Sequence, residues 1–207
     1  MASGFVSLTE SPPHPRVIVP PGWAAIAVSA DNGDTARRVF RDAWTQGPRD
    51  SIGPFIHRLE EWLASVLDDA RDAGCFRVIL PMGVPWQVPV STAISLSFAP
   101  AAARDASALP GAELRDTDAG TARRLITDLP VAGADPEALA LLRTVEYVWP
   151  LPDADGALIA FASISGQPVA EFAPVTDALT VLIETMLDAL DWPTAPAEQA
   201  TNQEESA

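Results

Sequence analysis

Two long segments of the chain carry apolar residues at the spacing of a single helix face. One lies between Pro54, which suits a first helical turn, and Gly74, which suits a left-handed stop. The other begins at Phe172 and ends near Leu190, and its one-sided stripe predicts a helix that lies on a sheet. A shorter helix is predicted over residues 35–44, after a capping turn at 31–34.

Other segments have the β-branched and aromatic content of strands. The loop at 81–89 is too short for a helical crossover, so the strands on either side of it are predicted to be antiparallel. A hairpin around Asp118-Ala119-Gly120 and a short helical turn over 135–141 are also predicted, while residues 99–111 are assigned to a loop. The predicted strands are residues 23–28, 75–80, 88–98, 113–115, 122–129, 142–151 and 157–164.

The two ends of the chain differ from the rest. The first fifteen residues end in Ser11-Pro12-Pro13-His14-Pro15, and the last fifteen are polar and acidic without an apolar period. We therefore expect a flexible N-terminal segment at 1–15, a single α/β domain at 16–192 and a disordered acidic tail at 193–207.

The chain is strongly acidic, with 28 aspartate and glutamate residues, 13 arginines, no lysine and a formal net charge of −15. A field of this sign repels phosphate backbones and anionic lipid, so nucleic acid and membranes are poor partners. Basic proteins or cationic ligands are electrostatically favoured. A simpler explanation is that the charge keeps the protein in solution.

Residues able to carry out chemistry are few. Cys75 opens an apolar strand, which is typical of a structural thiol, although Arg77 could share its face. His57 lies beside its helix stripe with Glu61 one turn later, which predicts a solvent-side contact, and His14 falls in the flexible N-terminal segment. These environments favour structural roles over catalysis.

The sequence contains no glycine-rich phosphate loop, and its aspartates lack the spacing of a calcium-binding loop. We therefore predict no catalytic residue, no metal and no cofactor. The lone cysteine, the missing signal peptide and the lack of a membrane-length apolar run predict a cytoplasmic protein. The aspartates in question are turn residues: Asp31, Asp34, Asp153 and Asp155.

Four segments together resemble a known family: Pro20-Pro21-Gly22-Trp23, residues 145–152 (VEYVWPLP), residues 158–163 (LIAFAS) and Leu190-Asp191-Trp192. In this combination the chain resembles small actinobacterial proteins of the PsbP-like α-β-α sandwich fold. The resemblance implies a central antiparallel β-sheet flanked by helices on both faces. It also implies a binding role, because the better-known members of that fold bind other proteins and the fold has no characteristic set of catalytic residues.

Two surfaces are candidates for partner binding. The last helix carries four acidic residues close to one line, with no arginine on the helix to neutralise them. Trp86 lies in the loop at 82–87, where an amphipathic ring suits a partner anchor. Trp23, Trp62, Trp149 and Trp192 are expected in the core instead. The acidic residues are Asp177, Glu184, Asp188 and Asp191.

These observations favour a non-catalytic protein-binding or adaptor module with an acidic recognition surface. One alternative is a cytosolic chaperone or escort for an exported or assembly-bound client. The other is a small-molecule-binding protein or enzyme whose apolar pocket, between sheet and helix, takes its polar groups from Arg123, Arg124 or Arg143. The oligomeric state and the partner stay open.

Overall fold

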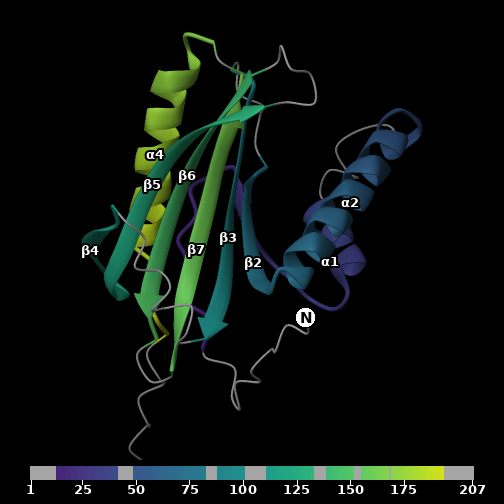
Figure 1. The fold of residues 1–207 in the computed structure, drawn as a ribbon. Helices are drawn as coiled ribbons and strands as arrows, with labels where there is room; N and C mark the ends of the chain where they lie inside the picture. Colours follow the sequence, from purple (N-terminus) through teal and green to yellow (C-terminus); the bar gives the residue numbers. More distant parts are fainter. Residues whose placement is uncertain are drawn as a thin grey trace, which may run out of the picture.

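The computed structural model describes residues 13–41, 49–82, 88–100, 111–132, 139–151, 155–167 and 169–193. Their strands form a seven-stranded antiparallel sheet in the order β1-β2-β3-β7-β6-β5-β4 (Figure 1). The predicted α+β class with an antiparallel sheet is confirmed. The elements are β1 (Trp23–Ala27), α1 (Asn32–Val39), α2 (Arg49–Asp72), β2 (Cys75–Pro81), β3 (Val90–Pro100), β4 (Glu113–Thr117), β5 (Gly120–Ala132), β6 (Leu139–Pro150), β7 (Gly156–Gly166) and α4 (Phe172–Asp188).

The local signals in the sequence set most element boundaries. Helix α1 begins at Asn32 and not at residue 35, because the Asp31 side chain accepts a hydrogen bond from the Asp34 backbone N–H at 2.9 Å. Gly74 has a φ of 80° just after α2, so its predicted role as a left-handed stop is confirmed.

Two further boundary predictions are contradicted by strand pairing. The predicted helical turn at 135–141 ends in strand, because residues 139–141 pair with β5. The loop assigned to 99–111 begins too early, since Ala99 and Pro100 still pair with β7. In both cases ladder hydrogen bonds to a neighbouring strand override a weak local signal. Residues 101–110 and 133–138 lie outside the described residues.

Helix α4 packs its apolar stripe against the central strands β6 and β7 (Figure 1). Ile183 and Leu187 are fully buried, in one cluster with Tyr147 and Trp149 of β6. Each large side chain buried in this way stabilises the fold by about 1.5–3 kcal/mol. The stripe predicted from the sequence is therefore what attaches α4 to the sheet.

A second apolar cluster joins α1 and α2 to the β1–β2 end of the sheet. Leu63 and Leu67 of α2 pack with Val78 and Leu80 of β2, whereas Ile79, between them, belongs to the α4 cluster. Side chains alternate along a strand, so the two clusters lie on opposite sides of β2. Figure 1 shows α2 leaning away from the sheet beside β2.

We predict that Gly166→Ala destabilises the fold. A Cβ there would meet the Phe172 ring at 2.6 Å and the Pro89 carbonyl oxygen at 2.9 Å, and Phe172 is buried. Overpacking of this kind costs about 1–3 kcal/mol, measurable by urea unfolding.

The matched control is Gly33→Ala in α1, where the nearest atom to the new Cβ lies at 3.7 Å. It should leave the free energy of unfolding unchanged or raise it by up to about 1 kcal/mol. Equal effects of the two substitutions would contradict the tight approach of α4 to β7.

Candidate functional site

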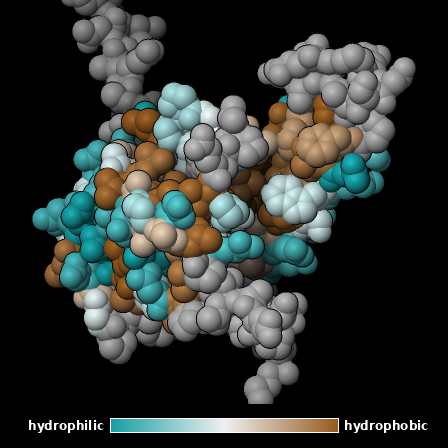
Figure 2. Space-filling model, turned by 90° about the horizontal axis from the view of Figure 1, so that it is seen from above, coloured by the Kyte–Doolittle hydropathy of each residue, from teal (hydrophilic) through white to brown (hydrophobic). Residues whose placement is uncertain are grey.

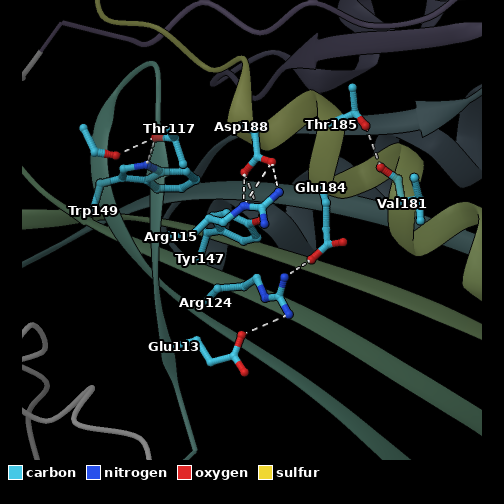
Figure 3. A network of polar contacts seen from close by, with 11 residues as sticks. Glu113, Arg115, Thr117, Arg124, Tyr147, Trp149, Val181, Glu184, Thr185 and Asp188 are labelled. Atoms are coloured by element: carbon cyan, nitrogen blue, oxygen red, sulfur yellow. Dashed lines mark hydrogen bonds and ion pairs between the residues drawn. The ribbon is translucent and has the colours of Figure 1, made fainter.

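Asp177, Glu184 and Asp188 on α4, with Asp191 just beyond its end, form an acidic line, and the sequence suggested that its charge was uncompensated. The structure contradicts this expectation. Each of the four carboxylates forms an ion pair with an arginine from another part of the fold, and Figure 3 shows two of these pairs. The expectation of unneutralised charge was wrong because the arginines come from the strands and the N-terminal segment, not from the helix. The pairs are Asp177–Arg143 at 2.6 Å, Glu184–Arg124 at 2.6 Å, Asp188–Arg115 at 2.6 Å and Asp191–Arg16 at 2.8 Å.

Two of these pairs, Asp188–Arg115 and Glu184–Arg124, attach the β4–β5 hairpin to α4. Asp188 also accepts a hydrogen bond from the Tyr147 hydroxyl at 3.2 Å, and burial together with this carboxylate raises the pKa of Tyr147. The Trp149 Nε1–H donates to Thr117 Oγ1 at 2.9 Å (Figure 3). The expected core role of Trp149, which is fully buried, is confirmed. The polar face of α4 therefore has a structural use.

The histidines and the cysteine do not form a site. His57 is a solvent-side residue whose Nε2 lies 3.3 Å from Glu61, as predicted. Cys75 is half-buried, and burial raises the pKa of its thiol, which disfavours the reactive thiolate. His14 stacks on Phe76 with ring centroids 4.3 Å apart, and burial followed by the charge of Arg77 lowers the pKa of His14. His14 therefore lies against Phe76 of β2.

A groove of about 730 Å³ separates α2 from the sheet. Figure 2 shows brown hydrophobic surface in this gap, between α2 at the right and the sheet. Trp62 and Val66, one turn apart on α2, form one wall. Trp62 is 54% exposed, so its expected place in the core is wrong. Leu63 and Leu67 are buried against β2, and this contact turns the neighbouring Trp62 and Val66 toward the groove.

The opposite wall and the rim come from the turn before β1 and from β2, β3 and β7. The Trp23 backbone N–H donates to the Pro20 carbonyl at 3.1 Å, and the Met82 N–H donates to the Gly22 carbonyl at 2.6 Å. Gly22 has a φ of 83°, which allows the turn. The lining residues from these elements are Pro21, Gly22, Trp23, Leu80, Pro81, Met82, Val88, Pro89, Val90, Ser91, Thr92, Ala93, Ser163 and Ser165.

The polar residues of this groove are hydroxyl-bearing, not the predicted arginines. Ser91, Ser163 and Ser165 line it, while Arg124 and Arg143 are held in the α4 ion pairs. Arg123 does not line the groove either. Trp86 falls at 83–87, outside the described residues. An apolar pocket between sheet and helix was one of the alternatives drawn from the sequence, but no sequence signal placed it beside α2, because its position depends on the angle between α2 and the sheet.

A second depression of about 550 Å³ lies beside α1. It is lined by Arg37, Arg38 and Arg41 together with Asp31 and Asp34. Arg37 pairs with Asp34, and the pKa of Asp34 is lowered by this hydrogen bond. Its charges are largely matched within the depression, so it is a weaker candidate than the apolar groove.

No family model matches the sequence, and comparisons with curated proteins and with solved structures likewise found no match. Among the described residues there is no cluster of His, Cys, Asp or Glu that could hold a metal ion. Within the same part of the chain, none of the helices has the length and apolarity required to cross a bilayer.

We predict that Glu184→Gln lowers the free energy of unfolding by about 1–3 kcal/mol, because it removes a charged hydrogen-bond partner of Arg124. The side chains of this pair are only 17% and 21% exposed. Asp177→Asn is the matched control: its side chain is 66% exposed, and the cost should stay below about 1 kcal/mol. Urea unfolding of both variants measures the difference, and equal losses would contradict the structural role given to Glu184.

Proposed function

We propose that this protein is a non-catalytic binding module that holds an apolar segment of a partner protein in the groove between α2 and the sheet. The observation that carries the proposal is Trp62, a large aromatic side chain that stands exposed on the wall of an apolar groove. Exposed tryptophans in such settings often dominate the binding energy of protein interfaces. The site differs from the acidic helix face that the sequence favoured.

The shape and lining of the groove support a polypeptide ligand. One wall is the side of a helix and the other includes the sheet residues Ala93 and Ser163. Such walls suit an apolar residue inserted between helix and sheet, as in helix-in-groove or strand recognition. The rim carries tryptophan, proline and methionine. The flexible methionine side chain adapts to different apolar side chains, and the rigid rings lose little conformational entropy on binding.

The charge of the protein bears on the class of partner. A net charge of −15 favours a basic protein and speeds its association, whereas nucleic acid and anionic membranes are repelled. A chaperone or escort for a basic client is one specific form of this proposal. A cytoplasmic location is proposed with it, on the evidence of the single cysteine.

The placement of the helices on the two faces of the sheet is part of the same proposal. We propose an α-β-α sandwich of the PsbP-like kind, with α4 on one side of the sheet and α1 and α2 on the other. The alternation of Val78 and Leu80 with Ile79 along β2 supports helices on both faces. In this sandwich the second helical layer covers mainly the β1–β2 end, which accounts for the groove beside it.

Binding of a small molecule is the second candidate function. The groove volume of about 730 Å³ falls in the range of small-molecule sites, and the serine hydroxyls could orient a ligand. A thermal-shift screen against metabolites separates the two classes, because a ligand of the native state raises the melting temperature. A metabolite whose stabilising effect disappears in Trp62→Ala would favour this candidate.

We predict that a phage-displayed random peptide library yields peptides with a shared apolar residue, and that Trp62→Ala reduces their affinity at least tenfold. Loss of a central aromatic contact of this type costs about 2–4 kcal/mol. Val181→Ser is the control, because Val181 is exposed to a similar degree, 62%, but lies on α4. Fluorescence anisotropy with the selected peptides measures the affinities. No enrichment, or equal binding by wild type and Trp62→Ala, would contradict the proposed function.

A further inference from the structure

The side of the sheet turned away from α4 carries exposed apolar residues beyond the groove. We call this side of β3, β7, β6 and β5 the open face. It includes Phe161, which is 42% exposed, and Leu129, which is 47% exposed. The other open-face residues used below are Ala93, Ser95, Leu125, Glu146 and Ser163, which register places on the same side of neighbouring strands.

Glu146 is the acidic residue at the centre of this face. Its register partners are two apolar residues, Leu125 on β5 and Phe161 on β7. Among the described residues no hydrogen bond or ion pair reaches its carboxylate. Arg123 lies on the same side of β5, opposite Val148, but makes no ion pair with Glu146. The acidic residues of α4 are all paired, so Glu146 stands apart from them.

This position is unfavourable for the isolated protein. Burial raises the pKa of the Glu146 carboxyl, and no neighbouring cation offsets the effect. A group with a raised folded-state pKa stabilises the fold only at low pH, and that contribution is lost as the pH rises through the folded-state pKa. Ionisation of the Glu146 carboxyl therefore opposes folding. A charged residue in an apolar environment that has no pairing group within the protein is expected at a functional site.

The geometry connects Glu146 to the groove. Ser163 and Ala93 line the groove, and the next open-face residues along their strands are Phe161 and Ser95. Phe161 is the direct cross-strand neighbour of Glu146. Two residues along a strand span roughly 7 Å and adjacent strands lie about 5 Å apart, so Glu146 lies roughly 10 Å from the groove floor.

We propose that Glu146 and Phe161 bind an arginine or lysine side chain of the same partner segment whose apolar residue occupies the groove. The inference rests on the proposed function and adds the chemistry of the partner. A carboxylate beside an exposed aromatic ring offers a basic side chain both a charged hydrogen bond and a cation–π contact. The net charge of −15 attracts such a segment.

The distance fixes the spacing of the two anchors in the partner. An extended segment advances about 3.3 Å per residue, and an arginine side chain adds several ångströms of reach. The basic residue therefore lies about two to four positions from the apolar residue in the groove. The partner motif is an apolar anchor followed or preceded, at this spacing, by arginine or lysine.

Parallel selections from one random phage-displayed peptide library test the inference. Wild type should enrich peptides with arginine or lysine at the stated spacing from an apolar residue. Glu146→Gln should keep the apolar residue and lose the basic preference, and Glu146→Arg should select aspartate or glutamate at that position. Asp118→Asn, in the β4–β5 turn, changes the net charge as Glu146→Gln does and should leave the preference intact.

Affinities of the wild-type consensus peptide give the second readout. Glu146→Gln should weaken binding of this peptide about tenfold, and so should replacing the basic residue of the peptide by glutamine. The two changes made together should weaken binding no more than either change alone. The melting temperature of Glu146→Gln should equal or exceed that of wild type, which separates lost recognition from lost folding.

Two outcomes overturn the inference. Equal frequencies of basic residues in the wild-type and Glu146→Gln selections, with binding still dependent on Trp62, would refute the role of Glu146 and leave the groove function standing. Failure of the library to yield any Trp62-dependent peptide would refute the groove function and this inference together.

Discussion

The attachment of α4 to the sheet is the constraint on which the rest of the molecule depends. The apolar stripe of α4 buries Tyr147 and Trp149, and the carboxylates along its edge pair with arginines that project from β4, β5 and β6 and from the N-terminal segment. Such pairs add modestly to stability, but they hold α4 in one position over the β4–β5 hairpin. They also use the acidic side chains that the sequence made prominent, so these carboxylates are already paired within the fold.

The groove follows from how the other helices meet the sheet. Leu63 and Leu67 attach α2 to β2, while β3 and β7 present small residues such as Ala93 and Ser163 to the same side. Small side chains of this kind offer little apolar area for a helix to bury. Helix α2 therefore stays at the β1–β2 end, and Trp62 is left beside an uncovered stretch of sheet.

The sequence predicted the elements well, because their signals are local: the stripe from Phe172 to Leu190, the glycine after α2 and the turn at Asp118-Ala119-Gly120. The antiparallel pairing of β2 with β3 followed from the short loop between them. The site could not be predicted in the same way. Pairing of Glu184 with Arg124 joins residues 60 positions apart, and only strand register and helix placement bring them together. Trp62 carries the same helix-stripe signal as a buried residue, so its exposure depends on the tilt of α2.

We propose that recognition occurs between α2 and the open face and not along α4. Backbone amide chemical-shift mapping by NMR, with a selected peptide added to the labelled protein, tests it most directly. The account predicts shifts in α2 around Trp62 and in β3 and β7 around Ala93 and Ser163, with α4 unchanged. Shifts confined to the exposed side of α4, around Asp177 and Val181, would contradict it.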